Sequence, residues 1–453
     1  MKLPNYFLAD LPAGATLDMA MISEACRTLK RNREQYLPSR STESLVKVLC
    51  SVASNWLEPD YPLRKLALEH GPRETGFSEQ TLAKGLDSFF KQLTQENFHR
   101  LIENELGHAH RLDSFAVTGA EKRSQSTALA SGPEFLVHIA AGKIPNPAFM
   151  SIVLGALVRS AQFMKCASGC SFLPRLLAHS IYEADAKLGA CIEIAEWRGG
   201  NSGLESVLFS EADCVTATGS DETLAQIRQC LQVKTRFLGY GHRVSFGYVT
   251  RDALSGAAWK KIVGRAANDV VAWDQLGCLS PHVIYVEHGG GMSAEQFAGL
   301  LADELEQREQ TEPRGKLSAE AAATITSRRG FYEVRAANSD ETRLWHSKNS
   351  TAWTVAYEAD AQFQTSCLNR FIYVKGATDL ARTLQAADNV RGKVSTVGLA
   401  ATNEQAEKLA TELARWGVTR ICPLGEMQNP PLTWHHDGRP ALGDLVTWAD
   451  FEK

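Results

Sequence analysis

Short apolar runs alternate with amphipathic segments along most of the chain after residue 134. The run Phe135–Ala141 precedes an amphipathic segment at Ala148–Ser160, and a second apolar run follows at Ala161–Lys165. A strand recurs about every 20 to 30 residues, which is the spacing of parallel strands joined by crossover helices. The later expected strands are Cys191–Trp197, Asp213–Ala217, Lys234–Leu238, Val244–Val249, Val283–Glu287, Phe371–Val374, Val394–Gly398 and Arg420–Cys422.

The first part of the chain has a different pattern, with helical periodicity at Ser41–Trp56, Ser78–Leu93 and Gln95–Leu106. Charged residues and Pro313 make Arg308–Arg314 an expected surface turn or linker. We expect two α/β halves joined near Ser255–Gln275. The expected domains are a helical N-terminal region at 1–130, a dinucleotide-binding α/β domain at 131–260, a catalytic α/β domain at 261–425 and a C-terminal tail at 426–453.

Composition excludes several classes of protein. Of 453 residues, 44% are hydrophobic and 22% charged, and the net charge of −4 leaves no basic surplus to bind nucleic acid. The longest apolar stretch, Ile152–Met164, is interrupted by Arg159 and Gln162, so we expect no membrane-spanning helix. The N-terminal segment carries Asp10 and Asp18 and shows no secretory signal, which predicts a cytoplasmic location.

The ten cysteines are expected to be thiols in a reducing compartment, most of them buried. No Cys-x-x-Cys pair occurs, and Cys166 and Cys170 have no second pair near them, so no metal site is predicted. The remaining question is whether one cysteine is a nucleophile. Cys278 is the candidate, because Gly277 and Ser280-Pro281 flank it at a predicted helix-to-strand junction.

Two turns could contact a nucleotide, because doubly wound sheets bind ligands beyond the carboxyl ends of their strands. Gly219 and Ser220 lie between a predicted strand and helix, where they either approach a pyrophosphate or, in the case of Ser220, cap the helix. Lys165 ends a strand, and Ser168 follows where an acidic residue would bind a free ribose hydroxyl. No G-x-G-x-x-G motif is present.

The segment His435-His436-Asp437-Gly438 suggests either a metal or general-base site or a turn in the C-terminal tail. Adjacent histidines in a strand point to opposite faces, which makes a poor chelate and favours the turn.

From about Ile139 onward the chain resembles the acyl-CoA reductase family of the aldehyde dehydrogenase superfamily, the LuxC-like fatty acid reductases. The matching segments are Gly142–Asn146, Phe163–Ser168, Glu196–Gly200, Thr218–Ser220, Gly239–Ser245, Trp273–His282, Ser395–Gly398 and Trp434–Leu445. The resemblance implies an aldehyde dehydrogenase-like fold with two Rossmann-like α/β domains and a helical N-terminal region.

The resemblance also implies roles for individual residues. Cys278 matches the superfamily nucleophile, Lys165 matches the lysine at the adenosine ribose, and Gly219 and Ser220 match the phosphate-proximal turn. Ser168 replaces the acid common in NAD-preferring relatives, so the implied cofactor is NADPH. The candidate oxyanion-hole amide is Asn146, although its Pro-Asn-Pro context differs from the usual Pro-Trp-Asn.

One departure from the superfamily bears on the reaction. Oxidative aldehyde dehydrogenases carry a glutamate that activates water, whereas the corresponding stretch Leu238–His242 has no carboxylate. This favours reduction of an acyl-enzyme over its hydrolysis. His242 is a candidate proton donor or a cation that lowers the pKa of Cys278, and a purely structural role is the alternative. The motif that holds the nicotinamide ribose is absent, so no residue is assigned to it.

The leading hypothesis is an NADPH-dependent oxidoreductase that converts long-chain fatty acyl-CoA or acyl-carrier thioesters to aldehydes through an acyl-cysteine. An aldehyde dehydrogenase or another acyl reductase on the same fold is the second hypothesis, and its product distinguishes it. A non-reducing acyl-carrying or scaffolding subunit is the third. We also expect a homo-oligomer and an acyl-protein synthetase or transferase partner.

Overall fold

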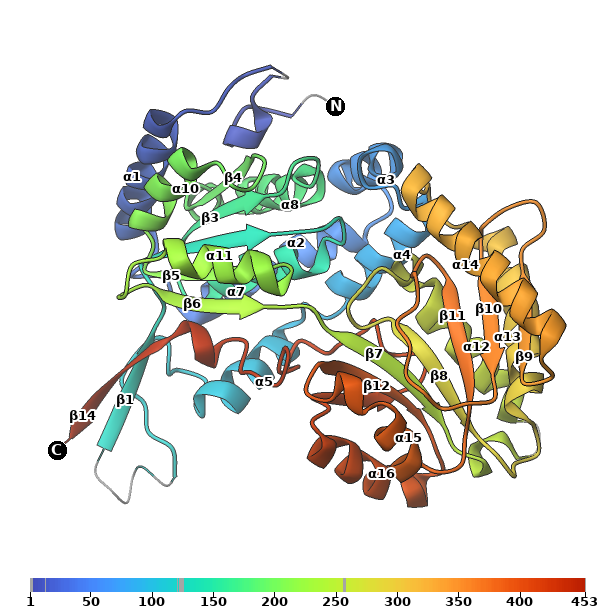
Figure 1. Ribbon diagram of the computed structural model, residues 1–453. Helices are drawn as coiled ribbons and strands as arrows, with labels where there is room; N and C mark the ends of the chain where they lie inside the picture. The colour runs from blue at the N-terminus through green and yellow to red at the C-terminus, as the bar shows by residue number, and fades with distance from the viewer. Residues whose placement is uncertain (1–2, 13, 120, 122–125, 256–257, 453) are drawn as a thin grey trace. The chain divides into compact units, whose positions relative to one another are not determined.

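The computed structural model describes residues 3–12, 14–119, 121, 126–255 and 258–452 (Figure 1). The chain divides into two compact units. Unit 1 comprises Met1–Thr75, Leu86–Gly241 and Pro431–Lys453, and unit 2 comprises Gly76–Gly85 and His242–Pro430. Each unit contains one parallel sheet and is described separately.

The sheet of unit 1 has five parallel strands in the order β4-β3-β2-β5-β6. The strand order reverses at β2, since β3 and β4 lie on one side of it and β5 and β6 on the other. Such a switch point is where doubly wound sheets bind ligands. The strands are β2 (Phe135–Ala140), β3 (Ala161–Cys166), β4 (Ile192–Glu196), β5 (Cys214–Thr218) and β6 (Arg236–Tyr240).

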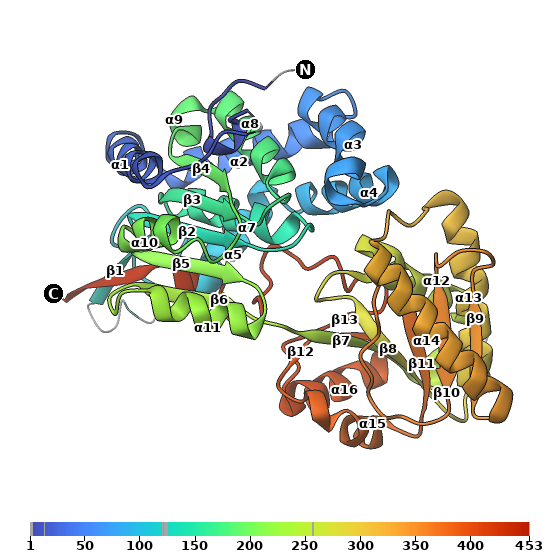
Figure 2. The same ribbon diagram turned by 45° about the horizontal axis from the view of Figure 1, so that its top comes forward.

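Helices cover both faces of this sheet (Figure 2). Phe163 packs in a core with Ile22 of α1 and Leu208 of α10. Its neighbour Gln162 points to the opposite face, against Gly155 of α7. The helices of unit 1 are α1 (Met19–Tyr36), α2 (Thr42–Leu57), α3 (Pro62–Thr75), α5 (Gln95–Leu106), α7 (Asn146–Leu157), α8 (Phe172–Ala184), α9 (Ala186–Gly189), α10 (Ser202–Ser210) and α11 (Asp221–Cys230). Helix α4 (Glu79–Phe90) belongs to unit 2 up to Gly85 and to unit 1 from Leu86.

The C-terminal segment returns to unit 1. There β14 (Thr447–Glu452) pairs antiparallel with β1 (Ser126–Ser131). The carboxylate of Glu105 accepts hydrogen bonds from three consecutive backbone N–H groups, those of Ala441, Leu442 and Gly443. These bonds fix the chain just before β14.

The sheet of unit 2 has seven strands in the order β13-β12-β7-β8-β11-β10-β9, parallel except for the edge strand β9. The strands are β7 (Val244–Val249), β8 (Pro281–Glu287), β9 (Thr342–His346), β10 (Thr354–Glu358), β11 (Phe371–Ala377), β12 (Val394–Ala400) and β13 (Arg420–Pro423). Helices cover both of its faces, as in unit 1.

Two separate cores flank this second sheet. Helices α12 (Trp259–Val271) and α13 (Ala294–Thr311) pack on one face. Figure 1 shows α14 (Ala319–Asn338), α15 (Leu380–Ala386) and α16 (Asn403–Trp416) on the other face. Short 3-10 helices lie at Leu8–Asp10, Asp252–Leu254, Ala272–Gln275, Asp388–Val390 and Gly443–Leu445.

The structure confirms the predicted α/β class and contains a strand at each expected position, with bounds that agree to the residue at Val244–Val249 and differ by one or more residues elsewhere. The expected turn at Arg308–Arg314 is wrong at its start, because α13 continues to Thr311. Inside that helix Arg308 forms an ion pair with Glu304, one turn earlier. The charged residues there are half-buried members of a helix rather than a linker. No helix of the described residues is long and apolar enough to cross a membrane.

Helix α4 requires a glycine where it meets Trp273. A Cβ atom at Gly85 would overlap the Trp273 indole, whereas a Cβ atom at Gly330 in α14 would meet nothing within 4 Å. We expect Gly85→Ala to destabilise the protein by about 1–3 kcal/mol through overpacking. The matched control Gly330→Ala should stabilise it by up to about 1 kcal/mol, because alanine favours a helix. Denaturant unfolding measures both, and a neutral Gly85→Ala would contradict this packing.

Candidate functional site

The carboxyl edge of the five-stranded sheet brings together the turns after β2 and β5. The Ala141 N–H donates to Thr218 Oγ1 at 3.2 Å and so ties the two turns at the switch point. Ser220 caps α11, since its Oγ accepts the Thr223 N–H at 3.2 Å. Gly219 lies between β5 and that cap, and its own N–H donates to the Tyr240 carbonyl. The capping role predicted for Ser220 is therefore present in the structure.

Lys165 lies on β3 at the same edge and is only 5% exposed. Its Nζ stands 5.7 Å from the centroid of the Trp197 ring. Among the described residues, its ammonium makes no hydrogen bond or salt bridge. Burial lowers the pKa of Lys165, and the nearby carboxylate of Glu205 partly offsets this shift. A buried, unpaired ammonium at a ligand-binding edge is suited to an anionic or hydroxyl group of a ligand.

Ser168 is exposed in the turn after β3. A carboxylate that the sequence analysis did not single out shapes this turn. Glu196, at the end of β4, accepts the N–H groups of Gly169 at 2.7 Å and Ser171 at 3.1 Å. Arg198 is exposed two residues further on. Glu196 and Arg198 are charged residues at the end of a strand, beside the candidate edge. Their position in the sequence is the signal that could have identified them.

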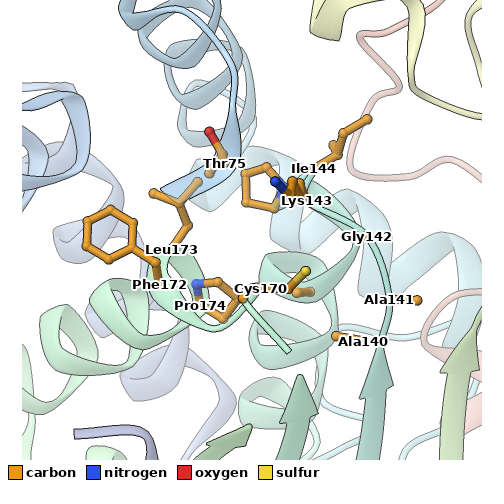
Figure 3. Close-up of a pocket in the computed structure, with 13 residues that line it drawn as sticks. Thr75, Ala140, Ala141, Gly142, Lys143, Ile144, Cys170, Phe172, Leu173 and Pro174 are labelled. Carbon is orange, nitrogen blue, oxygen red and sulfur yellow. The ribbon is translucent and has the colours of Figure 1, made fainter. Parts of the chain in front are cut away.

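A pocket opens at the carboxyl ends of β2 and β3. Figure 3 shows that the turns after these two strands contribute most of its lining, including Lys143 and Cys170. Burial raises the pKa of the Cys170 thiol, so this cysteine is a poor nucleophile. Pro145 and Ala148 also line the pocket, on either side of the residues that begin α7.

Asn146 begins α7 directly after the pocket residue Pro145. Its Oδ1 atom is buried and accepts no hydrogen bond from any residue that the structure describes. An unpaired amide at the start of a helix fits a residue that serves a ligand rather than the fold. Asn146 belongs to unit 1, whereas Cys278 and His242 belong to unit 2.

Cys278 lies in a tight turn between the 3-10 helix Ala272–Gln275 and β8. The Ser280 N–H donates to the Gly277 carbonyl at 2.9 Å. From β7, Ser245 Oγ donates to the Cys278 carbonyl at 2.8 Å and accepts the Thr396 N–H at 3.1 Å. The backbone of the turn is thus fixed, while the residue itself is exposed.

Cys278 does not lie at the carboxyl edge of its sheet, which is where doubly wound sheets bind their ligands. Ser245 pairs with Pro281 across the β7–β8 ladder, so the turn lies where these parallel strands begin. This is the amino edge of the seven-stranded sheet and not its carboxyl edge. The candidate nucleotide turns of unit 1 lie at the carboxyl edge, where doubly wound sheets bind ligands, whereas the Cys278 turn does not.

Burial separates the ten cysteines. It raises the thiol pKa of eight of them, which are Cys26, Cys50, Cys166, Cys170, Cys191, Cys214, Cys367 and Cys422. The two exposed cysteines are Cys230, at the end of α11, and Cys278. Only Cys278 combines this exposure with a turn held from neighbouring strands, which supports its choice as nucleophile.

His242 is exposed and precedes β7, at the same edge as the Cys278 turn. It lies close enough to His282 for its charge to act there. Burial, and then the charge of His242, lower the pKa of His282 to about 4. The Ser366 N–H donates to His282 Nδ1 at 3.1 Å, so the neutral ring carries its proton on Nε2.

Gln428 also contacts the Cys278 turn, and the sequence analysis did not single it out. Its Nε2 donates to Ser280 Oγ at 2.5 Å. A Cβ atom at Gly277 would lie 2.7 Å from the same nitrogen, so the glycine lets the carboxamide approach. No local sequence signal marks Gln428, because it lies 148 positions from Ser280.

The segment His435–Gly438 forms a turn, as expected. The Gly438 N–H donates to the His435 carbonyl at 3.0 Å, and Asp437 and Gly438 both have positive φ. His436 stacks on Tyr240 at the end of β6, with ring centroids 4.3 Å apart. Among the described residues, no group of three or more His, Cys, Asp or Glu residues could hold a metal ion.

Comparisons with known structures show an aldehyde dehydrogenase-like α/β fold. An NADP-dependent glyceraldehyde-3-phosphate dehydrogenase from Bacillus halodurans C-125 gives a TM-score of 0.70 at 14% identity, over 96% of this chain and 91% of the other. A bifunctional proline utilization A protein gives 0.71 at 14% identity, and the chain covers 45% of its length. The predicted fold is thereby confirmed.

The acyl-CoA reductase (LuxC) family matches residues 37–448, and the chain belongs to this family. A long-chain acyl-protein thioester reductase of Photorhabdus laumondii is 22% identical over 418 residues, which is 90% of this chain and 82% of the relative. The predicted class, an oxidoreductase that acts on acyl groups, is confirmed.

Proposed function

We propose that this protein reduces long-chain fatty acyl thioesters to aldehydes with NADPH, through an acyl-enzyme on Cys278. The observation that carries the proposal is the Cys278 turn, in which an exposed thiol lies on a backbone fixed by Ser245. Membership of the acyl-CoA reductase family and the long-chain acyl-protein thioester reductase among the relatives support the substrate class.

The proposed chemistry begins when the Cys278 thiolate attacks the thioester carbonyl and the donor thiol leaves. Backbone N–H groups of the turn and the Asn146 amide stabilise the developing oxyanion. The role of Asn146 in oxyanion stabilisation is what the family resemblance implies. When bound, NADPH would supply the hydride that reduces the acyl carbon. The thiohemiacetal on Cys278 would then collapse to the aldehyde and release the Cys278 thiolate.

Residues at the carboxyl edge of unit 1 would hold the cofactor. Lys165 offers an unpaired cation for the adenosine ribose and its 2′-phosphate, and Ser168 leaves room where an acid would repel that phosphate. Gly219 and the first turn of α11, capped by Ser220, would face the pyrophosphate. Arg198, exposed at the end of β4, would add positive charge.

The remaining expectations are part of the proposal. Unit 1 would act as the cofactor domain and unit 2 as the catalytic domain. The donor is an acyl-CoA or an acyl-carrier thioester, supplied with the help of an acyl-protein synthetase or transferase in the cytoplasm, and the enzyme is a homo-oligomer. A thioester donor agrees with the Photorhabdus relative, which is a long-chain acyl-protein thioester reductase.

The decisive test is Cys278→Ala. The variant should neither become labelled by radioactive acyl-CoA nor form aldehyde, because no sulfur is left to accept the acyl group. NADPH affinity, measured by fluorescence titration, should stay unchanged, since the proposed cofactor residues lie in unit 1. Cys230→Ala, which removes the other exposed thiol, is the matched control and should keep both activities.

Two results would refute this assignment. One is an acyl label that persists in Cys278→Ala, and the other is a free acid rather than an aldehyde as the main product of the native protein. The second result would favour an oxidative aldehyde dehydrogenase. An acyl label on Cys278 without any cofactor binding would instead favour an acyl-carrying subunit.

Cofactor preference is tested at Ser168. Ser168→Glu should weaken NADPH binding by roughly 1–3 kcal/mol, because the added carboxylate would repel the 2′-phosphate. NADH binding should change much less. Ser210→Glu, at the exposed end of α10, is a control for added negative charge on the same unit. Equal affinities of the native protein for NADH and NADPH would contradict the proposal.

His242 is proposed as the proton donor to the thiohemiacetal oxygen, or as the cation that lowers the Cys278 pKa. If it is the acid, His242→Ala should lower turnover by roughly 10²–10⁴ and remove one limb of the pH profile. A loss below about tenfold with an unshifted pH profile would assign His242 to a structural role. Stopped-flow reduction of a preformed acyl-enzyme measures this step directly.

A further inference from the structure

The residues that lead into the Cys278 turn have an unusual backbone. Trp273, Asp274 and Gln275 have φ values of 51°, 51° and 63° in succession. Residues with a Cβ rarely adopt this left-handed conformation, and three in a row persist only where the surroundings determine it. Strain of this kind is concentrated at functional sites.

A second run of the same kind lies beside it. Leu368, Asn369 and Arg370 have φ values of 60°, 56° and 64°, directly before β11. A buried ion pair joins the two runs. Arg370 Nε donates to Asp274 Oδ1 at 3.0 Å, and Arg370 Nη2 lies 2.8 Å from the same oxygen.

Further contacts fix both ends of this ion pair. The Gly315 N–H donates to the other oxygen of Asp274 at 3.0 Å. Arg370, which is 1% exposed, also donates to Glu309 at 3.0 Å and to the Glu312 carbonyl at 2.8 Å. The pair therefore has several hydrogen bonds to stabilise charges that are removed from water.

Gln275 connects the same region to the sheet. Its Nε2 donates to the Pro281 carbonyl at 2.8 Å and to the Phe371 carbonyl at 2.9 Å, which are the first residues of β8 and β11. The Cys278 turn thus begins at a residue bonded to two strands and ends in one of those strands.

We propose that the Asp274–Arg370 ion pair and the Gln275 carboxamide are a positioning device that aims the Cys278 turn at the acyl carbonyl. None of these side chains reacts. They set the direction of the Cys278 sulfur and of the backbone N–H groups beside it, on which attack and oxyanion stabilisation depend. The inference rests on the proposed role of Cys278.

The chain offers a matched control for a loss of stability. Glu358 and Lys375 form another buried ion pair, 2.7 Å long, in which each side chain is 2% exposed. They are paired in register across β10 and β11, at the carboxyl ends of those strands. Arg370 precedes the other end of β11, so this second pair lies in the same sheet but away from the Cys278 turn.

The experiment compares Asp274→Asn with Glu358→Gln, each in a Cys230→Ser background so that Cys278 is the exposed thiol that remains. The first readout is the rate at which iodoacetamide alkylates Cys278, followed across pH by peptide mass spectrometry without substrate. The second is the separation of kcat from KM in the full reaction, and melting temperatures report stability.

We expect Asp274→Asn to change the alkylation rate of Cys278 or shift its pH midpoint, and to lower kcat by about tenfold or more with a smaller change in KM. Glu358→Gln should leave these readouts within about twofold at a similar loss of melting temperature. If both variants change the rates in proportion to their loss of melting temperature, the ion pair is structural only and the proposal is wrong.

A milder variant covers the case in which Asp274→Asn fails to fold. Gln275→Met keeps the side-chain volume and removes the bonds that Nε2 donates to the Pro281 and Phe371 carbonyls and to Ser366 Oγ. It should alter the same readouts in the same direction. An unchanged alkylation profile and kcat in Gln275→Met would overturn the proposal. Because alkylation needs no substrate, this outcome is distinct from failure of the proposed function, which Cys278→Ala reports.

Discussion

Parallel strand pairing is the constraint on which the rest of the structure depends. In a parallel sheet all strands begin at one edge and end at the other, so residues far apart in sequence meet wherever they occupy the same end of a strand. In unit 1 this places Lys165 and Gly219 at the carboxyl edge. In unit 2 it places the Cys278 turn opposite Ser245 at the amino edge. The candidate cofactor residues and the candidate nucleophile therefore lie at these two sheet edges.

The elements that the sequence predicts well are those with a strong local period. The strands at Ala161 and Val244 are fully buried, the strand at Phe135 is buried over its first four residues, and each begins where the apolar pattern begins. The sequence analysis missed β1 and β14 because their pairing joins residues more than 300 positions apart, and the side chains of β14 are all exposed. It ended α13 too early because the charges around Arg308 resemble a linker until Glu304 is seen one turn away.

The same distinction applies to the candidate site. Cys278 and Ser220 carry local turn and cap signals, so sequence reasoning could find them. Their supporting residues carry no such signal. Ser245 lies 33 positions from Cys278, and Arg370 lies 96 positions from Asp274. Strand pairing in the sheet brings these residues close to the turn. Only the fold therefore shows that Ser245 in β7 fixes the backbone of the Cys278 turn before β8.

The two edges differ in how firmly their residues are held, and this difference suits the proposed reaction. Attack on a thioester tolerates little misplacement of the nucleophile, and the Cys278 turn is tied by its carbonyl and by both of its ends. At the carboxyl edge of unit 1, the proposed cofactor site, Lys165 is buried, whereas the turn residues Ser168 and Arg198 are exposed. A cofactor that binds and leaves in every turnover needs an accessible edge, whereas a covalent nucleophile needs a fixed one.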